Sequence, residues 1–85
     1  MDKQKKTKFE IAVIKKVVEM RNKKGFSQDD IATALELTRG FIGQIESPNS
    51  ASKYNLNHLN RLAYEMGCKP KDFIPDNFIA EDDWD

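Results

Sequence analysis

Two long polar side chains and two glycines share one side of a short segment near the middle of the chain. A helical advance of about 100° per residue places on one arc Arg39, Gly40, Gly43 and Gln44. A guanidinium and a carboxamide each offer paired hydrogen-bonding groups in a plane, so Arg39 suits the edge of a guanine and Gln44 that of an adenine. Two glycines within a helix cost about 1 kcal/mol each relative to alanine. The usual compensation is close approach of the backbone to another surface.

Two short helices, joined by about three residues, would position this face. The second is predicted to begin after Thr38, whose hydroxyl can cap it. Its opposite arc is apolar and consists of Phe41, Ile42 and Ile45. The first is predicted to begin after Ser27, which forms a capping box with Asp30. Its apolar stripe consists of Ile31, Ala32 and Leu35. Such a pair, with Arg and Gln exposed on the second helix, describes a helix-turn-helix with a recognition helix.

The stretch from Ser27 to Glu46 resembles the phage repressor/Cro-type helix-turn-helix regulators, also called the XRE family. Their pattern is S-Q-x-x-L-A-x-x-L-G-V-S-x-x-x-I-x-x-I-E. The positions that match it in type and spacing are Ser27, Gln28, Ile31, Ala32, Leu35, Leu37, Thr38, Ile42, Ile45 and Glu46. The resemblance extends upstream through Arg21 and downstream through a helix at 56–67. It implies an all-α, five-helix lambda-repressor-like domain whose third helix enters the major groove.

The resemblance also implies roles for residues around the recognition helix. Gln28 would hydrogen-bond a DNA phosphate and brace that helix, although an exposed helix former without a fixed contact is the general alternative. Arg21 and Glu46 stand where such regulators place a structural ion pair. The alternative for Arg21 is a guanidinium that reaches solvent without a fixed partner. Glu36 departs from the pattern, because this turn position is usually glycine with positive φ, which costs another residue about 1 kcal/mol.

Base choice is expected to depend on few side chains. Arg39 and Gln44 would each contribute about 1–3 kcal/mol of discrimination, and Thr38 would touch a phosphate or a thymine methyl. Gly40 and Gly43 would leave the helix backbone bare, so each domain would recognise only a short half-site.

Further phosphate contacts are expected from the loop after the recognition helix and from the helix that follows it. Lys53 lies in the turn-rich loop at 47–54, for which a plain solvated connector is an equally good interpretation. Asn55 is predicted to cap the fourth helix, and the free amides at Leu56 and Asn57 would offer an anion site. The apolar side of that helix is predicted to comprise Leu56, Leu59, Leu62, Ala63 and Met66.

The remaining chain completes the expected domain organisation. A first helix has an apolar stripe formed by Phe9, Val13, Ile14, Val17 and Met20, and Gly25 ends it. A short fifth helix is predicted between Pro70 and Pro75. Residues 1–8 form a basic flexible arm, residues 9–75 the helix-turn-helix domain and residues 76–85 an acidic tail. The arm either is solvated or follows DNA phosphates. The tail carries three large apolar residues that suggest docking on the domain or a partner subunit, namely Phe78, Ile79 and Trp84.

Length and charge limit the classes of function. The 85 residues allow one domain with a modest core. Lysine plus arginine equals aspartate plus glutamate at 14 each, but residues 1–24 hold nine bases against three acids, whereas residues 75–85 hold five acids and no base. Without the tail, 14 bases therefore face nine acids, so we expect the ordered part to be cationic at one end.

The sequence also argues against other kinds of site. Cys68 is the single cysteine, so we expect no intramolecular disulfide, no thiolate metal cluster and a reducing, cytoplasmic location. No apolar run is long enough for a membrane span. His58 lacks a partner pattern and is interpreted as a polar helix residue. We therefore expect no cofactor, no metal and no enzyme activity.

Two classes of function remain. The first is a sequence-specific transcriptional regulator, expected to act as a repressor, that binds double-stranded DNA as a homodimer on an inverted repeat. The second uses the same fold for protein binding, as an antitoxin paired with a toxin or as a phage adaptor. Its support is the zero net charge, the apolar acidic tail and the small set of base-reading side chains.

Overall fold

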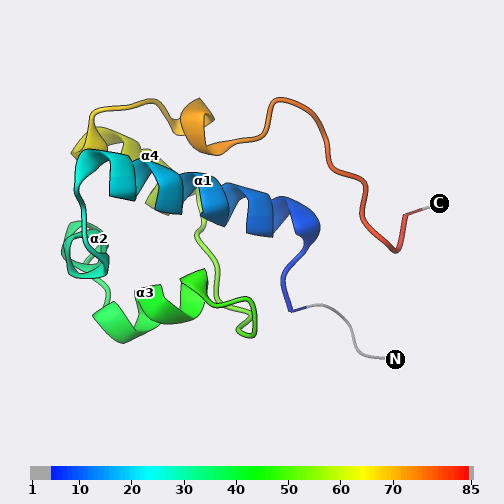
Figure 1. Ribbon diagram of the computed structural model, residues 1–85, viewed down its shortest axis with the longest axis horizontal. Coiled ribbons are helices and arrows are strands. Elements are labelled where there is room, and N and C mark those ends of the chain that lie inside the picture. Colours follow the sequence, from blue (N-terminus) through cyan, green and yellow to red (C-terminus); the bar gives the residue numbers. More distant parts are fainter. Residues whose placement is uncertain (1–4, 85) are drawn as a thin grey trace.

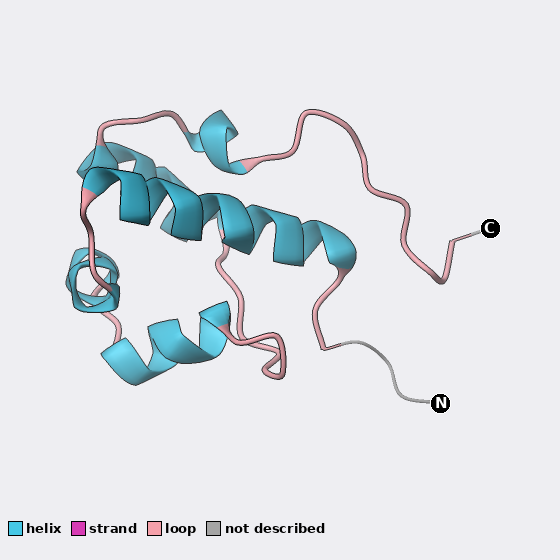
Figure 2. Ribbon diagram, in the orientation of Figure 1, coloured by secondary structure: helices cyan, strands magenta, loops and turns pink. Residues whose placement is uncertain are grey.

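The computed structural model describes residues 5–84, which form four α-helices and one turn of 3-10 helix (Figures 1 and 2). In chain order these are α1 (Lys8–Lys24), α2 (Gln28–Leu35), α3 (Arg39–Glu46), α4 (Leu56–Met66) and η1 (Pro70–Phe73). No strand occurs among these residues, so the all-α class is confirmed. The count of five α-helices is not, because the segment bounded by Pro70 and Pro75 completes only a single 3-10 turn.

Side chains at the helix ends fix where each helix starts. The hydroxyl of Ser27 accepts from the Asp30 amide at 3.1 Å, and the Asp30 carboxylate accepts in return from the Ser27 amide, as the capping box predicts. Thr38 caps α3 and Asn55 caps α4, both as expected. Gly25 ends α1 and Gly67 ends α4, each with a left-handed backbone.

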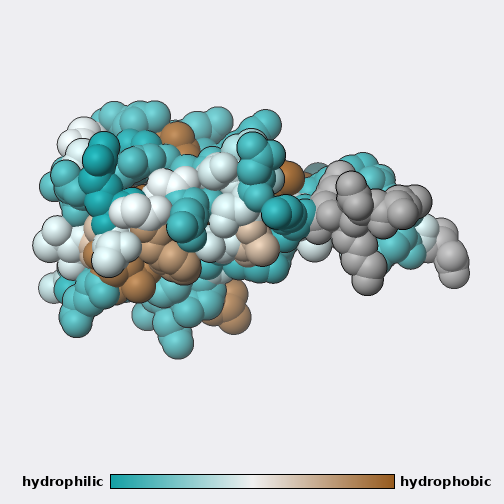
Figure 3. Space-filling view, turned by 90° about the horizontal axis from the view of Figure 1, so that it is seen from below, coloured by the Kyte–Doolittle hydropathy of each residue, from teal (hydrophilic) through white to brown (hydrophobic). Residues whose placement is uncertain are grey.

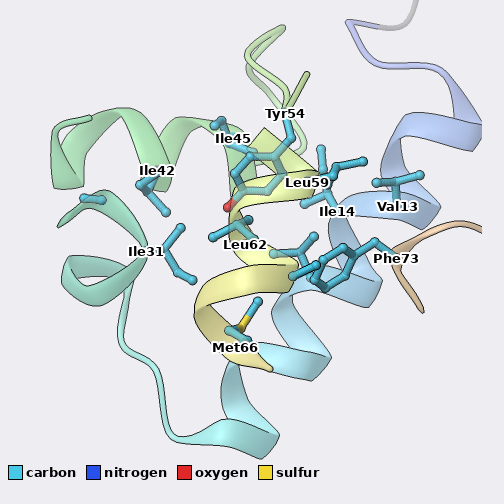
Figure 4. Close-up of a cluster of buried hydrophobic side chains, with 13 residues drawn as sticks. Val13, Ile14, Ile31, Ile42, Ile45, Tyr54, Leu59, Leu62, Met66 and Phe73 are labelled. Carbon is cyan, nitrogen blue, oxygen red and sulfur yellow. The ribbon is translucent and has the colours of Figure 1, made fainter. Parts of the chain in front are cut away.

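All five elements contribute to one core (Figure 4). Its fully buried side chains are Phe73, Ile31, Ile42, Ile45, Leu62 and Val17. The apolar stripes expected on α2, α3 and α4 face this core, with one exception. Leu56 is 80% exposed, because it is the first residue of α4 and lies at the edge of the packed interior. The core therefore holds α3 by Ile42 and Ile45 and leaves its opposite side outside.

The C-terminal segment returns to the start of α1 (Figure 1). The Glu81 carboxylate accepts from the backbone amides of Lys8 and Phe9 at 2.9 and 3.0 Å, and Asp82 pairs with the Lys8 ammonium at 2.8 Å. An acidic group is favourable at this end of a helix. Of the expected docking residues, Phe78 and Trp84 remain 81% and 56% exposed, and Ile79 is half-buried. The hydrogen bonds and the ion pair of the tail with α1 are made by Glu81 and Asp82.

Two observations concern the expected basic arm. Met1–Gln4 lie outside the described residues. Within the rest, Lys8 already belongs to α1, and the Lys6 side chain is buried, with 3% of its surface exposed.

Candidate nucleic-acid interface

Helices α2 and α3 are connected by three residues and pack against each other. Glu36 adopts φ 57° and ψ 41°, the left-handed conformation that the usual glycine would adopt. The amide of Glu36 donates to the Thr33 carbonyl, and that of Leu37 donates to the Ala32 carbonyl, so both turn amides are satisfied. The turn between α2 and α3 therefore forms with a glutamate in the left-handed position.

The outer side of α3 presents the residues expected to read bases. Arg39, Gly40 and Gln44 are exposed, and Gly43 is half-buried. Ile42 and Ile45 on the other side are fully buried. Figure 3 views the molecule from the side on which α3 lies and shows hydrophilic residues around a small hydrophobic area. The four positions thus lie on the outer side of α3, as predicted, although Gly43 is only partly exposed.

Neither glycine of this face is required by the fold. A Cβ atom added at Gly40 or at Gly43 would meet no atom within 4 Å. Neither residue has the positive φ that favours glycine, which among the described residues occurs at Gly25, Gly67 and Glu36. The helix-propensity cost of about 1 kcal/mol at each position is therefore not offset by internal packing.

Arg39 is held only loosely by its own protein. Its Nε lies 3.7 Å from the Asp29 carboxylate, and both side chains are largely exposed. This separation is too long for a hydrogen bond, and exposed ion pairs contribute at most about 1 kcal/mol. The guanidinium can therefore exchange this partner for another planar acceptor at little cost.

Gln44 has one contact that restrains its side chain. Its Oε1 accepts from the Ser52 hydroxyl at 3.4 Å, across the loop that follows α3. A carboxamide oxygen has a second lone pair, and the amide group has two donors. Gln44 therefore retains both acceptor and donor capacity toward solvent.

A bidentate ion pair fastens the carboxyl end of α3 to α1. The Nε and Nη2 atoms of Arg21 each lie 2.8 Å from a carboxylate oxygen of Glu46. The Gln28 amide donates to the same carboxylate at 2.9 Å. Burial of Glu46 opposes its ionisation, but the hydrogen bonds from Arg21 and Gln28 outweigh it and lower the pKa of Glu46. The expected ion pair is thus present, and Gln28 braces it.

The residues expected to contact phosphates do not share one face in the way that the expected base-reading residues do. Lys53 pairs with Glu10 of α1 at 2.8 Å. The Asn55 side chain accepts from the His58 amide at 2.7 Å and is occupied as a cap. Asn57 is exposed beside it. The structure therefore joins Arg39, Gln44 and the two glycines on one face, whereas Lys53 is directed toward α1.

Two features were missed by sequence reasoning. Thr7 and Glu10 form a capping box at the start of α1. The T-x-x-E spacing carries this signal and could have been used. The second is Lys6, whose ammonium donates to backbone carbonyls in the last turn of α3 and in the loop that follows it. A lysine within a lysine-rich run carries no local signal for burial.

A metal centre and a membrane-spanning helix are two other kinds of functional feature. No group of three or more His, Cys, Asp or Glu side chains in the described part of the chain is arranged to hold a metal ion. None of the helices described between residues 5 and 84 is long and apolar enough to cross a membrane. Comparison with protein-family models, with curated proteins and with solved structures finds no match.

Proposed function

We propose that this chain is a sequence-specific DNA-binding transcriptional regulator, acting as a repressor, in which α2 and α3 form a helix-turn-helix. The observation that carries the proposal is the pair Gly40 and Gly43. Both lie in α3 between two exposed planar polar side chains, and both have open space where a Cβ would stand. Glycine lowers the stability of α3 at both positions, and nothing inside the protein requires it there. Close approach of another molecule's surface to the helix backbone would explain both glycines.

The major groove of B-DNA is such a surface, since it admits an α-helix. In the proposed complex, Arg39 leaves Asp29 and pairs bidentately with a guanine, and Gln44 pairs with an adenine. Thr38 lies at the amino end of α3, where recognition helices approach base edges and phosphates. The Arg21–Glu46 pair and Gln28 keep α3 in place during this exchange.

Phosphate contacts would come from Gln28, from Lys53 and from the start of α4 near Asn55 and Asn57. For Lys53 this requires opening its pair with Glu10, which is a small cost for partly exposed side chains. Exposed lysines at the amino end of the chain would add to the attraction for DNA.

We further propose a homodimer on an inverted repeat. With 8 residues, α3 is about 12 Å long and spans only a short half-site. Two copies related by a two-fold axis would place their α3 helices about one turn of DNA apart, roughly 34 Å. We place this activity in the cytoplasm, where an unpaired cysteine such as Cys68 stays reduced.

A second function is favoured by one specific observation. Phe78 and Trp84 are exposed on an acidic segment that is anchored through Glu81. Large apolar side chains held at the surface are typical of protein contacts. An antitoxin or a phage adaptor would use them to bind a protein such as a toxin.

Titration of random-sequence duplex at low and moderate salt separates these two functions. The regulator should bind at low salt and lose affinity steeply as salt rises, because phosphate binding releases counterions. An interaction module should not bind at any salt. Selection of bound duplexes from a random pool then provides the operator, and an inverted repeat among the selected duplexes is the expected result.

A further inference from the structure

Lys6 is the one charged residue that is buried within the described part of the chain, with 3% of its surface exposed. Its ammonium donates to three backbone carbonyls, those of Gln44, Ser47 and Ser50. All three acceptors lie about 40 residues away in sequence, at the end of α3 and in the following loop. An ammonium has three donors, so the three carbonyls can satisfy it completely.

This site combines two favourable effects. The last carbonyls of a helix have no partner within the helix, and the helix dipole favours a cation there. The carbonyl of Gln44 belongs to the last turn of α3. The carbonyls of Ser47 and Ser50 belong to the loop, whose turn is closed by the Ser50 amide donating to Ser47. Lys6 thus joins the helix end and the loop through one charged group.

The loop leads back to a proposed base-reading side chain. The backbone amide of Ser52 donates to the Ser50 hydroxyl at 3.2 Å. The hydroxyl of Ser52 in turn donates to the Oε1 of Gln44 at 3.4 Å. Three hydrogen bonds, linked by the covalent structure of Ser50 and Ser52, therefore connect the buried ammonium with the Gln44 carboxamide.

We propose that Lys6 is a positioning residue for base recognition. Its ammonium holds the loop at 47–52 against the last turn of α3 and, through Ser52, sets the orientation of the Gln44 carboxamide. The inference rests on the proposed function, since it concerns how one residue of the proposed interface selects its base. Lys6 itself contacts no phosphate in this account, because its three donors are already occupied within the protein.

The test uses the full-length chain and a set of duplexes that each change one base pair of the selected operator. Gln44→Ala first identifies the base pair that depends on Gln44, and Arg39→Ala identifies a second, independent one. Lys6→Met is expected to lose about tenfold in discrimination at the Gln44 position alone. The dependence of log affinity on log salt should keep the wild-type slope.

Lys5→Met is the matched control, because Lys5 is the exposed neighbour in sequence. Because Lys5 would contact a phosphate, Lys5→Met should weaken binding to all duplexes alike. The salt-dependence slope should fall by about one unit, and discrimination between bases should be retained. Ser52→Ala removes only one hydroxyl and should lose part of the discrimination at the Gln44 position. If circular dichroism shows that Lys6→Met does not fold, Ser52→Ala alone tests the proposal.

The binding measurements can contradict the proposed function or this inference separately. A wild-type chain without any base preference would overturn the proposed function. If Lys6→Met and Ser52→Ala both keep the wild-type base preference at the Gln44 position, this inference is overturned and the proposed function is not. Equal loss on every duplex, or a slope reduced by one unit in Lys6→Met, would also overturn it, because Lys6 would then act on overall stability or on phosphate.

Discussion

The guanidinium of Arg21 and the carboxylate of Glu46 form a planar, two-bond ion pair between α1 and the last residue of α3, with both N–O distances at 2.8 Å. Only 14% and 12% of the two side chains are exposed, so the pair is largely desolvated. In such a setting, each charge depends on the other for compensation. The position of α3 on the domain therefore depends on this pair as well as on its apolar side.

Removing both members of the pair should cost less stability than the two single removals added together. We expect Glu46→Gln to lower the free energy of unfolding by about 3 kcal/mol, because it leaves the Arg21 charge buried without a partner. The double variant Arg21→Met with Glu46→Met should lose clearly less than the sum of the single changes. Urea unfolding measures both, and additive losses would show that the two charges act independently.

The same pair predicts a loss of stability in acid. The pKa of Glu46 is lowered in the folded protein, so its contribution is complete above the ordinary pKa of a glutamate and disappears as the pH falls through the lowered value. Thermal unfolding followed below about pH 4.5 should therefore depend less on pH in Glu46→Gln than in the wild type.

His58 predicts a second pH dependence at higher pH. Its Nδ1 accepts from the Asn55 amide at 3.1 Å, which only an unprotonated nitrogen can do. Burial lowers the pKa of His58, so the unfolded chain binds this proton more readily than the folded one. Stability should be complete above about pH 6.5 and should fall as the pH decreases through the lowered pKa.

His58→Gln is the control, since glutamine at this position keeps a capping-box acceptor and does not titrate. Melting temperatures between about pH 6.5 and pH 5 should fall in the wild type and stay level in His58→Gln. Parallel curves for the two proteins would show that His58 does not cause the dependence.

Arg39 and Asp29 provide a prediction about specificity. Arg39→Ala should relax the preference at one base pair, at a cost of about 1–3 kcal/mol for the preferred base. Asp29→Ala removes the loose partner of Arg39 and should leave that preference intact, because the 3.7 Å contact contributes little. Quantitative binding to operator variants measures both. Equal losses on operator and random duplex for Arg39→Ala would show that Arg39 is not a base reader.

Local features of the fold could be predicted from sequence, because they depend on neighbours within a few residues. The caps at Ser27, Thr38 and Asn55 and the left-handed ends at Gly25 and Gly67 all follow from short spacings. The exposed face of α3 follows from helical periodicity. These features defined the base-reading face, whereas the Arg21–Glu46 pair and the bracing role of Gln28 were expected from the family resemblance.

Contacts between distant segments could not be predicted in this way. Lys6 reaches the Ser50 carbonyl across 44 positions, and Lys53 reaches Glu10 across 43. Glu81 caps α1 from the opposite end of the chain. Each partner is a common surface residue type, and only the packed fold decides which of several possible partners it meets. The short fifth helix was predicted at the right place, but the two prolines leave room for only one 3-10 turn and not for an α-helix.

In the proposed complex, α3 meets DNA through a backbone that the two glycines keep bare. The most direct measurement compares the wild type with Gly40→Ala and Gly43→Ala, using thermal unfolding and affinity for the selected operator. Because an added Cβ meets only open space, each variant should be more stable by about 1 kcal/mol. The account predicts that this gain is accompanied by at least about tenfold weaker operator binding, since the new methyl groups would contact the bases. Variants that are more stable and still bind the operator with wild-type affinity would contradict it.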